Sequence, residues 1–127
     1  MIKTSPAVWK IVELSGAESL EQLDVWCTDS SREGTSAYDP MLGTLTLELI
    51  MKIEDMKSAE RKMAQHLRQA AKAVEREQER VDAGYDYVDT TWIEDAASKL
   101  SRHSADFVAA QKQAHLLAKL IKLHVKR

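Results

Sequence analysis

The 127-residue chain has few of the residues that interrupt helices or crosslink loops: four glycines, two prolines and one cysteine. The single cysteine, Cys27, has no second cysteine to pair with, which excludes an internal disulfide and favours a reducing compartment. No apolar run approaches the roughly 20 residues of a membrane-spanning helix, and no charged-then-apolar signal segment opens the sequence. We therefore expect a cytoplasmic protein with no membrane partner.

The scarce prolines and glycines also predict where helices begin and end. Asp39 followed by Pro40 has the form of an N-cap and a first-turn proline, whose missing N–H would be unpaired in any case. Gly84 suits the left-handed conformation that closes a helix. The sequence between these signals predicts a first long helix at 39–84.

A second long helix is predicted at 91–127. Thr91 and Glu94 have the spacing of a capping box, in which two side chains satisfy backbone N–H groups at a helix start. The residues at 85–90 form a tip loop between the two long helices. The two helices are therefore expected to fold back on each other.

Apolar residues recur along both long helices in steps of three and four, which is the spacing of a helix–helix seam. The seam is expected to contain Leu42, Leu45, Leu49, Met56, Met63, Leu67, Ala70, Val74, Val81, Ile93, Ala97, Leu100, Phe107, Ala114, Ala118, Ile121 and Val125. Small residues predict close approach of the two helices at Ala59, Ala70, Ala71, Ala97 and Ala118.

Residues 1–38 precede the first long helix and contain two candidate short helices. The first, at 6–14, begins with Ser5 as N-cap before a proline, although its β-branched and aromatic residues leave a strand as the alternative. The second, at 17–28, follows a capping box that Ser15 opens. We expect both short helices to pack at the open end of the hairpin.

The expected fold is all-α, in one domain of residues 1–127. It is a long antiparallel helical hairpin, coiled-coil-like in its packing, with the two short N-terminal helices at its open end. No nucleophile, phosphate-binding or zinc-protease motif occurs, and no histidine follows a glutamate by three residues as di-metal helix bundles require. We therefore expect a non-enzymatic protein with no metal site and no cofactor.

The apolar face of the second long helix is wider near the open end than one partner helix can cover. The leucine stripe, defined as Leu116, Leu120 and Leu123, lies away from the expected seam. Large apolar patches seldom stay bare, and twofold closure is the commonest oligomeric solution. The leucine stripe therefore predicts self-association, with a homodimer as the first guess.

The hairpin tip is unusually dense in aromatic and acidic residues. The acidic tip consists of Tyr85, Asp86, Tyr87, Asp89 and Trp92. Tyrosine and tryptophan are enriched among residues that dominate binding energies, so the acidic tip is a candidate site for a protein partner. The alternative interpretation is structural: Tyr85 and Trp92 plug the end of the hairpin, and the acids complement the dipole of the second long helix.

A basic stripe follows the second long helix near its C-terminus. The lysine stripe consists of Lys112, Lys119, Lys122 and Lys126. It is a possible anion-binding surface, but it contains neither an arginine for bidentate phosphate contacts nor an aromatic ring for base stacking. Nucleic acid is therefore possible as a partner and not favoured.

The favoured function is a non-enzymatic interaction or assembly protein that presents helical surface to a protein partner. One alternative is a nucleic-acid-binding accessory protein that uses the lysine stripe. The other is a small inhibitor whose acidic tip enters a cationic groove of its target and imitates nucleic acid there.

Overall fold

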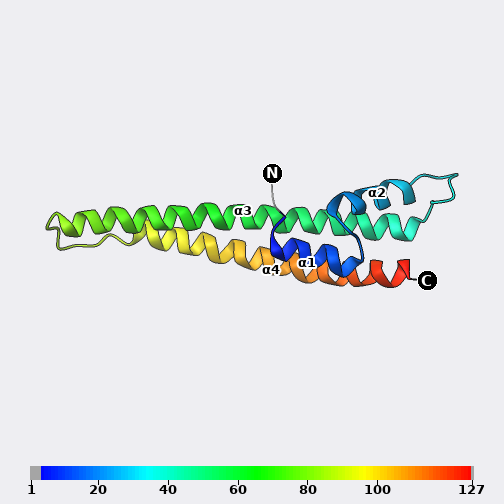
Figure 1. Cartoon of the computed structure of the whole chain (residues 1–127). Helices are drawn as coiled ribbons and strands as arrows, with labels where there is room; N and C mark the ends of the chain where they lie inside the picture. The colour runs from blue at the N-terminus through cyan, green and yellow to red at the C-terminus, as the bar shows by residue number, and fades with distance from the viewer. Residues whose placement is uncertain (1–3, 127) are drawn as a thin grey trace. The chain divides into compact units, whose positions relative to one another are not determined.

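The structure, a computed structural model, describes residues 4–126 and contains four helices in that range (Figure 1). They are α1 (Pro6–Ser15), α2 (Leu20–Ser30), α3 (Pro40–Asp82) and α4 (Thr91–Val125). The described residues form no strand. α3 and α4 run antiparallel and pack against each other, so the predicted all-α hairpin is confirmed. The predicted end of the second long helix at Arg127 lies outside the described residues.

The chain divides into two compact units. The base unit comprises residues 1–57 and 109–127, and it contains α1, α2, the first part of α3 and the last part of α4. The hairpin unit comprises residues 58–108, and it contains the rest of α3, the tip loop and the first part of α4. The two short helices thus share a unit with the start of α3 and the end of α4, as predicted.

α1 is a helix and not a strand, because both of its ends are satisfied as helix ends. The Val8 N–H donates to the Ser5 hydroxyl at 3.3 Å. Gly16 closes the helix with a φ of 87°, a conformation that residues with a Cβ rarely adopt. Val8 and Ile11, three residues apart, are buried on one face. The helix alternative for residues 6–14 is confirmed.

α2 begins three residues later than the sequence predicts. The Gln22 N–H donates to the Ser19 hydroxyl at 3.1 Å, and the Gln22 side-chain oxygen accepts the Glu18 N–H at 2.6 Å. This arrangement resembles a capping box, and it replaces the one predicted from Ser15. The Ser15 hydroxyl instead donates to the Val12 carbonyl within α1, at 2.6 Å.

All four helices contribute aliphatic side chains to the core of the base unit. Its buried residues include Val8 and Val12 of α1, Leu23 of α2, Leu49, Ile53 and Met56 of α3, and Ala114, Ala118 and Ile121 of α4. Burying one large aliphatic side chain contributes about 1.5–3 kcal/mol. α1 and α2 therefore cover part of the wide apolar face that the sequence places near the open end.

A side-chain hydrogen bond links the start of α3 to the end of α4. The Leu42 N–H donates to Asp39 Oδ1 at 3.1 Å, so Asp39 is the N-cap that the sequence predicts before Pro40. Asp39 Oδ2 lies 2.7 Å from Nε2 of His124 in the last turns of α4. The hydrogen bond with His124, and next the one from the Leu42 N–H, hold the pKa of Asp39 below its ordinary value.

The first turn of α3 approaches the end of α2 closely. A Cβ at Gly43 would lie 3.0 Å from Ser31 Oγ and 3.2 Å from Ser30 Oγ. Both hydroxyls are fixed, since Ser31 Oγ donates to the Cys27 carbonyl and Ser30 Oγ donates to the carbonyl of Trp26. Packing therefore explains this glycine inside a helix. The half-buried Cys27 forms no disulfide, and its thiol donates to the Gly43 carbonyl at 3.9 Å.

The hairpin unit has a narrower seam, and part of its predicted composition is wrong. Beyond Glu60, the α3 residues that are not exposed are Met63, His66, Ala70, Ala73, Glu77 and Arg80. The steps of three and four are as predicted, but Leu67, Val74 and Val81 are exposed. The predicted period is therefore right, as are Met63 and Ala70, whereas Leu67, Val74 and Val81 were assigned to the seam wrongly.

The predicted seam of α4 also needs correction. Ala96 is buried and Ala97 is exposed, so the expected close approach of the helices at position 97 is wrong. Ala71 on α3 and Val125 at the end of α4 are exposed too, although both were expected inside. Ala59 and Ala118 are buried as predicted.

A histidine pair occupies the seam position next to Leu67. His66 of α3 stacks on His103 of α4, with ring centroids 5.1 Å apart and planes inclined by 2°. His66 Nδ1 lies 2.9 Å from the side-chain oxygen of Gln69, and His103 Nδ1 lies 3.6 Å from Asp106 Oδ2. Because both rings have polar partners, they can be covered at low cost, and Leu67 is left facing outward.

Glu77 fixes the tip loop from within the seam. Its carboxylate is buried, accepts the Asp89 N–H at 3.0 Å and pairs with the Arg80 guanidinium at 3.3 Å. Arg80 also lies over the Tyr85 ring, 5.3 Å from its centroid. Gly84 has a φ of 95° just after α3, as the predicted helix end requires. The charged Glu77 thus holds the tip loop in place, a role that buried apolar residues have in the base unit.

The start of α4 uses other residues than the predicted capping box. The Thr91 N–H donates to Asp89 Oδ1 at 3.0 Å, and this bond is the main reason that the pKa of Asp89 is lowered. The Thr90 hydroxyl donates to Glu94 Oε1 at 3.1 Å. Asp89 and Thr90 therefore cap the start of α4, in place of the predicted capping box of Thr91 and Glu94.

Candidate functional site

The acidic tip exposes its aromatic side chains. Tyr87 is 71% and Trp92 is 65% exposed, and Tyr85 is exposed beside Arg80. Neither Tyr85 nor Trp92 is buried, as a plug at the end of the hairpin would be. Asp86 is also exposed. Binding of a protein partner through the acidic tip stays a prediction.

The leucine stripe on α4 is exposed in the base unit. Leu116, Leu120 and Leu123 are 59%, 40% and 64% exposed. On a helical wheel they lie on the opposite side of α4 from the buried Ala118 and Ile121. The stripe therefore lies outside the buried core of its own unit, and it offers three large apolar side chains to another molecule.

The lysine stripe lies beside the leucine stripe. All four of its lysines are exposed. Lys119, Lys122 and Lys126 line a hollow of about 280 Å³ together with Leu123. A molecule that covers the leucines therefore also comes close to several ammonium groups.

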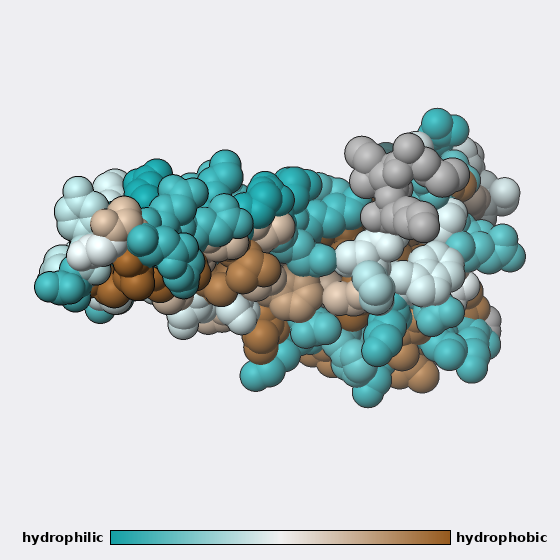
Figure 2. All heavy atoms as spheres, turned by 60° about the vertical axis from the view of Figure 1, so that its left-hand side comes forward, coloured by the Kyte–Doolittle hydropathy of each residue, from teal (hydrophilic) through white to brown (hydrophobic). Residues whose placement is uncertain are grey.

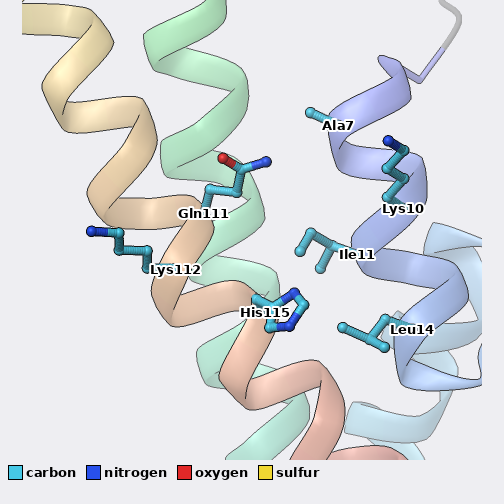
Figure 3. Close-up of a pocket in the computed structure, with 7 residues that line it drawn as sticks. All are labelled: Ala7, Lys10, Ile11, Leu14, Gln111, Lys112 and His115. Atoms are coloured by element: carbon cyan, nitrogen blue, oxygen red, sulfur yellow. The ribbon is translucent and has the colours of Figure 1, made fainter.

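A larger cavity of about 450 Å³ lies between α1 and α4 in the base unit. Ala7, Ile11 and Leu14 point from α1 toward α4, and Gln111 and His115 point back from α4 (Figure 3). Two further lining residues are the exposed lysines at positions 10 and 112. Apart from Lys10, the α1 side of the cavity is therefore apolar.

Sequence reasoning missed this cavity, because nothing in the sequence shows that α1 lies along this part of α4. Lys112 was assigned to the lysine stripe, while Lys10 and Gln111 received no role. Figure 3 shows the Lys112 side chain on α4 directed away from α1. The only available signal was the amphipathic pattern of α1, which predicts a buried face and does not identify its neighbour.

The hairpin unit also exposes apolar side chains at regular spacing. Leu67, Val74 and Val81 recur every seven residues on α3, and Leu67 is 60% exposed. Apolar side chains interrupt the hydrophilic surface of the molecule in the space-filling view (Figure 2). These residues retain the spacing of a helix–helix seam without being part of one in this chain.

Two kinds of site do not occur among residues 4–126. No cluster of three or more histidine, cysteine, aspartate or glutamate side chains is arranged to hold a metal ion. Within the same range, every helix is too short or too polar to cross a membrane.

Comparison of the chain with protein-family models, with curated proteins and with solved structures finds no match.

Proposed function

We propose that this protein is a non-enzymatic assembly protein that associates with a second copy of itself through the leucine stripe. The observation that carries the proposal is the exposure of Leu116, Leu120 and Leu123 on one face of α4. With its single cysteine free, the protein suits the reducing cytoplasm, and we place its function there.

The spacing of the three leucines supports a helical partner surface. Steps of four and three place their side chains in one row, which is the pattern that fits into the groove of a facing helix. Twofold pairing needs only one such surface, because each copy supplies the same row. α4 is well supported from behind, since Ala114, Ala118 and Ile121 are completely buried in the base unit.

The lysine stripe gives self-association a characteristic salt dependence. Each copy brings Lys112, Lys119, Lys122 and Lys126 to the margin of the contact. Like charges repel at low ionic strength, and at 0.1 M salt exposed charges more than about 10 Å apart are largely screened from each other. Self-association should therefore strengthen as salt is added, whereas binding of an acidic partner should weaken.

The test is the solution mass of the purified protein, measured by analytical ultracentrifugation from about 1 to 100 µM at low and at moderate salt. The wild type should form dimers, more readily at moderate salt. Leu120→Glu should shift the mass to the monomer, because a charge would enter the contact. A wild type that stays monomeric over this range rules the proposal out.

A matched control distinguishes association through the leucine stripe from non-specific hydrophobic association. Leu67→Glu makes the same change at an exposed leucine of the hairpin unit. It should leave the dimer intact. If Leu67→Glu dissociates the dimer and Leu120→Glu does not, the contact lies on the hairpin unit instead.

A further inference from the structure

A groove of about 350 Å³ lies between α3 and α4 in the hairpin unit. Its small residues are Ala73 of α3 and Ala96 of α4, which leave the space between the helices open. The rest of the groove is lined by three cationic side chains, one glutamine, one aspartate and one tryptophan: Lys72, Arg76, Lys99, Gln69, Asp95 and Trp92. This combination is absent from every surface that the sequence singled out.

Two of the cations stand on one face of α3. Lys72 and Arg76 are four residues apart, which places their side chains next to each other on the helix surface. Both are exposed, and within residues 4–126 neither forms an ion pair. The third cation, Lys99 of α4, is already paired with Asp95 at 3.0 Å. Lys72 and Arg76 are therefore the groups available to an anion.

The groove also has an exposed aromatic ring. Trp92 lines it from the start of α4, and its indole is largely open to solvent. An exposed indole provides a face on which a nucleobase can stack, whatever the base. While the indole would hold the base, an arginine suits the phosphate of the same ligand, because its planar guanidinium binds phosphate oxygens through two parallel hydrogen bonds.

We propose that this groove binds a nucleotide, with the base on Trp92 and the phosphate on Lys72 and Arg76. The lysine stripe of the base unit lacks both an arginine and an aromatic ring, and this groove has both. Its volume is at the lower end of the range for small-molecule sites, about 300–1,000 Å³, which suits one nucleotide.

The charge of the surrounding unit distinguishes a free nucleotide from a nucleic-acid strand. Residues 58–108 contain ten acidic and eight basic residues. A strand would bring further phosphates past the groove into this acidic surface, and phosphate contacts dominate the affinity for nucleic acid. The site therefore favours a free nucleotide over a nucleotide within a strand.

Tryptophan fluorescence tests the proposal directly. With Trp9→Phe and Trp26→Phe, Trp92 is the only fluorescent indole that remains. Adenosine 5′-monophosphate should quench it saturably, and adenosine or inorganic phosphate alone should bind at least about tenfold more weakly. Calorimetry on the wild type should give the same affinity without these substitutions. No saturable binding up to about 10 mM in either measurement overturns the proposal.

Matched variants locate the phosphate contact. Arg76→Gln should weaken adenosine 5′-monophosphate binding about tenfold or more, because it removes the bidentate donor. Arg68→Gln makes the same change at an exposed position of α3 outside the groove and should alter the affinity less than about twofold. Equal losses in the two variants overturn the proposal.

A short oligodeoxyadenylate tests the source of the nucleotide. It should bind no more tightly than adenosine 5′-monophosphate at about 0.15 M salt. Binding of the strand about tenfold more tightly would overturn the preference for a free nucleotide and make the groove part of a nucleic-acid surface.

Discussion

The base unit and the hairpin unit contain segments of the same two long helices, yet they are held together differently. In the base unit, α3 and α4 share a core with α1 and α2, and large aliphatic residues such as Leu49 and Ile121 are completely buried. In the hairpin unit, α3 and α4 have only each other. Their seam contains alanines, a histidine pair and a buried glutamate.

This difference follows from the number of helices that surround the seam. One partner helix covers a narrow strip, so small side chains and partnered polar groups are sufficient there. A core surrounded by four helices excludes water on every side, and large aliphatic residues then contribute most. The hairpin unit therefore has less apolar burial, and its apolar residues Leu67, Val74 and Val81 remain at the surface.

The largest expected effect tests this contrast with one substitution in each unit. Leu49→Ala should lower the free energy of unfolding by about 2–5 kcal/mol, because it leaves a cavity in the core of the base unit. Leu67→Ala should change it by less than about 0.5 kcal/mol, as exposed positions usually do. Urea denaturation followed by circular dichroism measures both. Equal losses would show that the two units do not differ in the way described.

The next effect concerns the buried carboxylate of the hairpin unit. Glu77→Ala should destabilise this unit by about 1–3 kcal/mol, because the Asp89 N–H and the Arg80 guanidinium lose their acceptor. Amide hydrogen exchange should show faster exchange at Asp89. Glu77→Gln keeps an oxygen acceptor and should lose less.

Glu75→Ala is the control for that experiment, since Glu75 is exposed two residues earlier on the same helix. It should change the free energy of unfolding by less than about 0.5 kcal/mol. If Glu75→Ala and Glu77→Ala lower the free energy of unfolding equally, the hydrogen bond between the Asp89 N–H and Glu77 does not stabilise the tip loop.

The sequence predicts the architecture well because helix signals are local. Proline after Asp39, glycine at 84 and the long period of three and four residues are each contained within one segment, and each indicates the correct helix. The caps of α2 and α4 were placed wrongly by one to a few residues. Two Ser or Thr residues stand near each of these helix starts, and only the fold decides which polar side chain caps the helix.

The membership of the seam was harder to predict because it depends on partners from the other helix. Leu67 is adjacent to His66, and a pattern based on hydropathy selects the leucine. His66 occupies the seam because His103 lies across from it, and Glu77 does so because Asp89 and Arg80 satisfy its carboxylate. The α1–α4 cavity and the groove at Arg76 and Trp92 likewise depend on which helix faces lie opposite each other, so neither follows from the sequence alone.

The smallest expected effect concerns the contact between Asp39 and His124 in the base unit. Because the folded pKa of Asp39 is lowered from its ordinary value of 3.8, the ionised carboxylate stabilises the fold above about pH 3.8. This contribution is lost as the pH falls through the lowered pKa. Its size should stay below about 1 kcal/mol, because the side chain is 36% exposed and solvent screens the contact.

The measurement compares the free energy of unfolding at pH 7 and pH 3 in the wild type and in Asp39→Asn. The wild type should lose more stability on acidification than Asp39→Asn, because only the wild type has the carboxylate that must take up a proton. His124→Gln removes the first cause of the lowered pKa and should reduce the difference as well. If all three proteins lose the same stability between these pH values, the contact between the start of α3 and the end of α4 does not contribute to the acid sensitivity of the base unit.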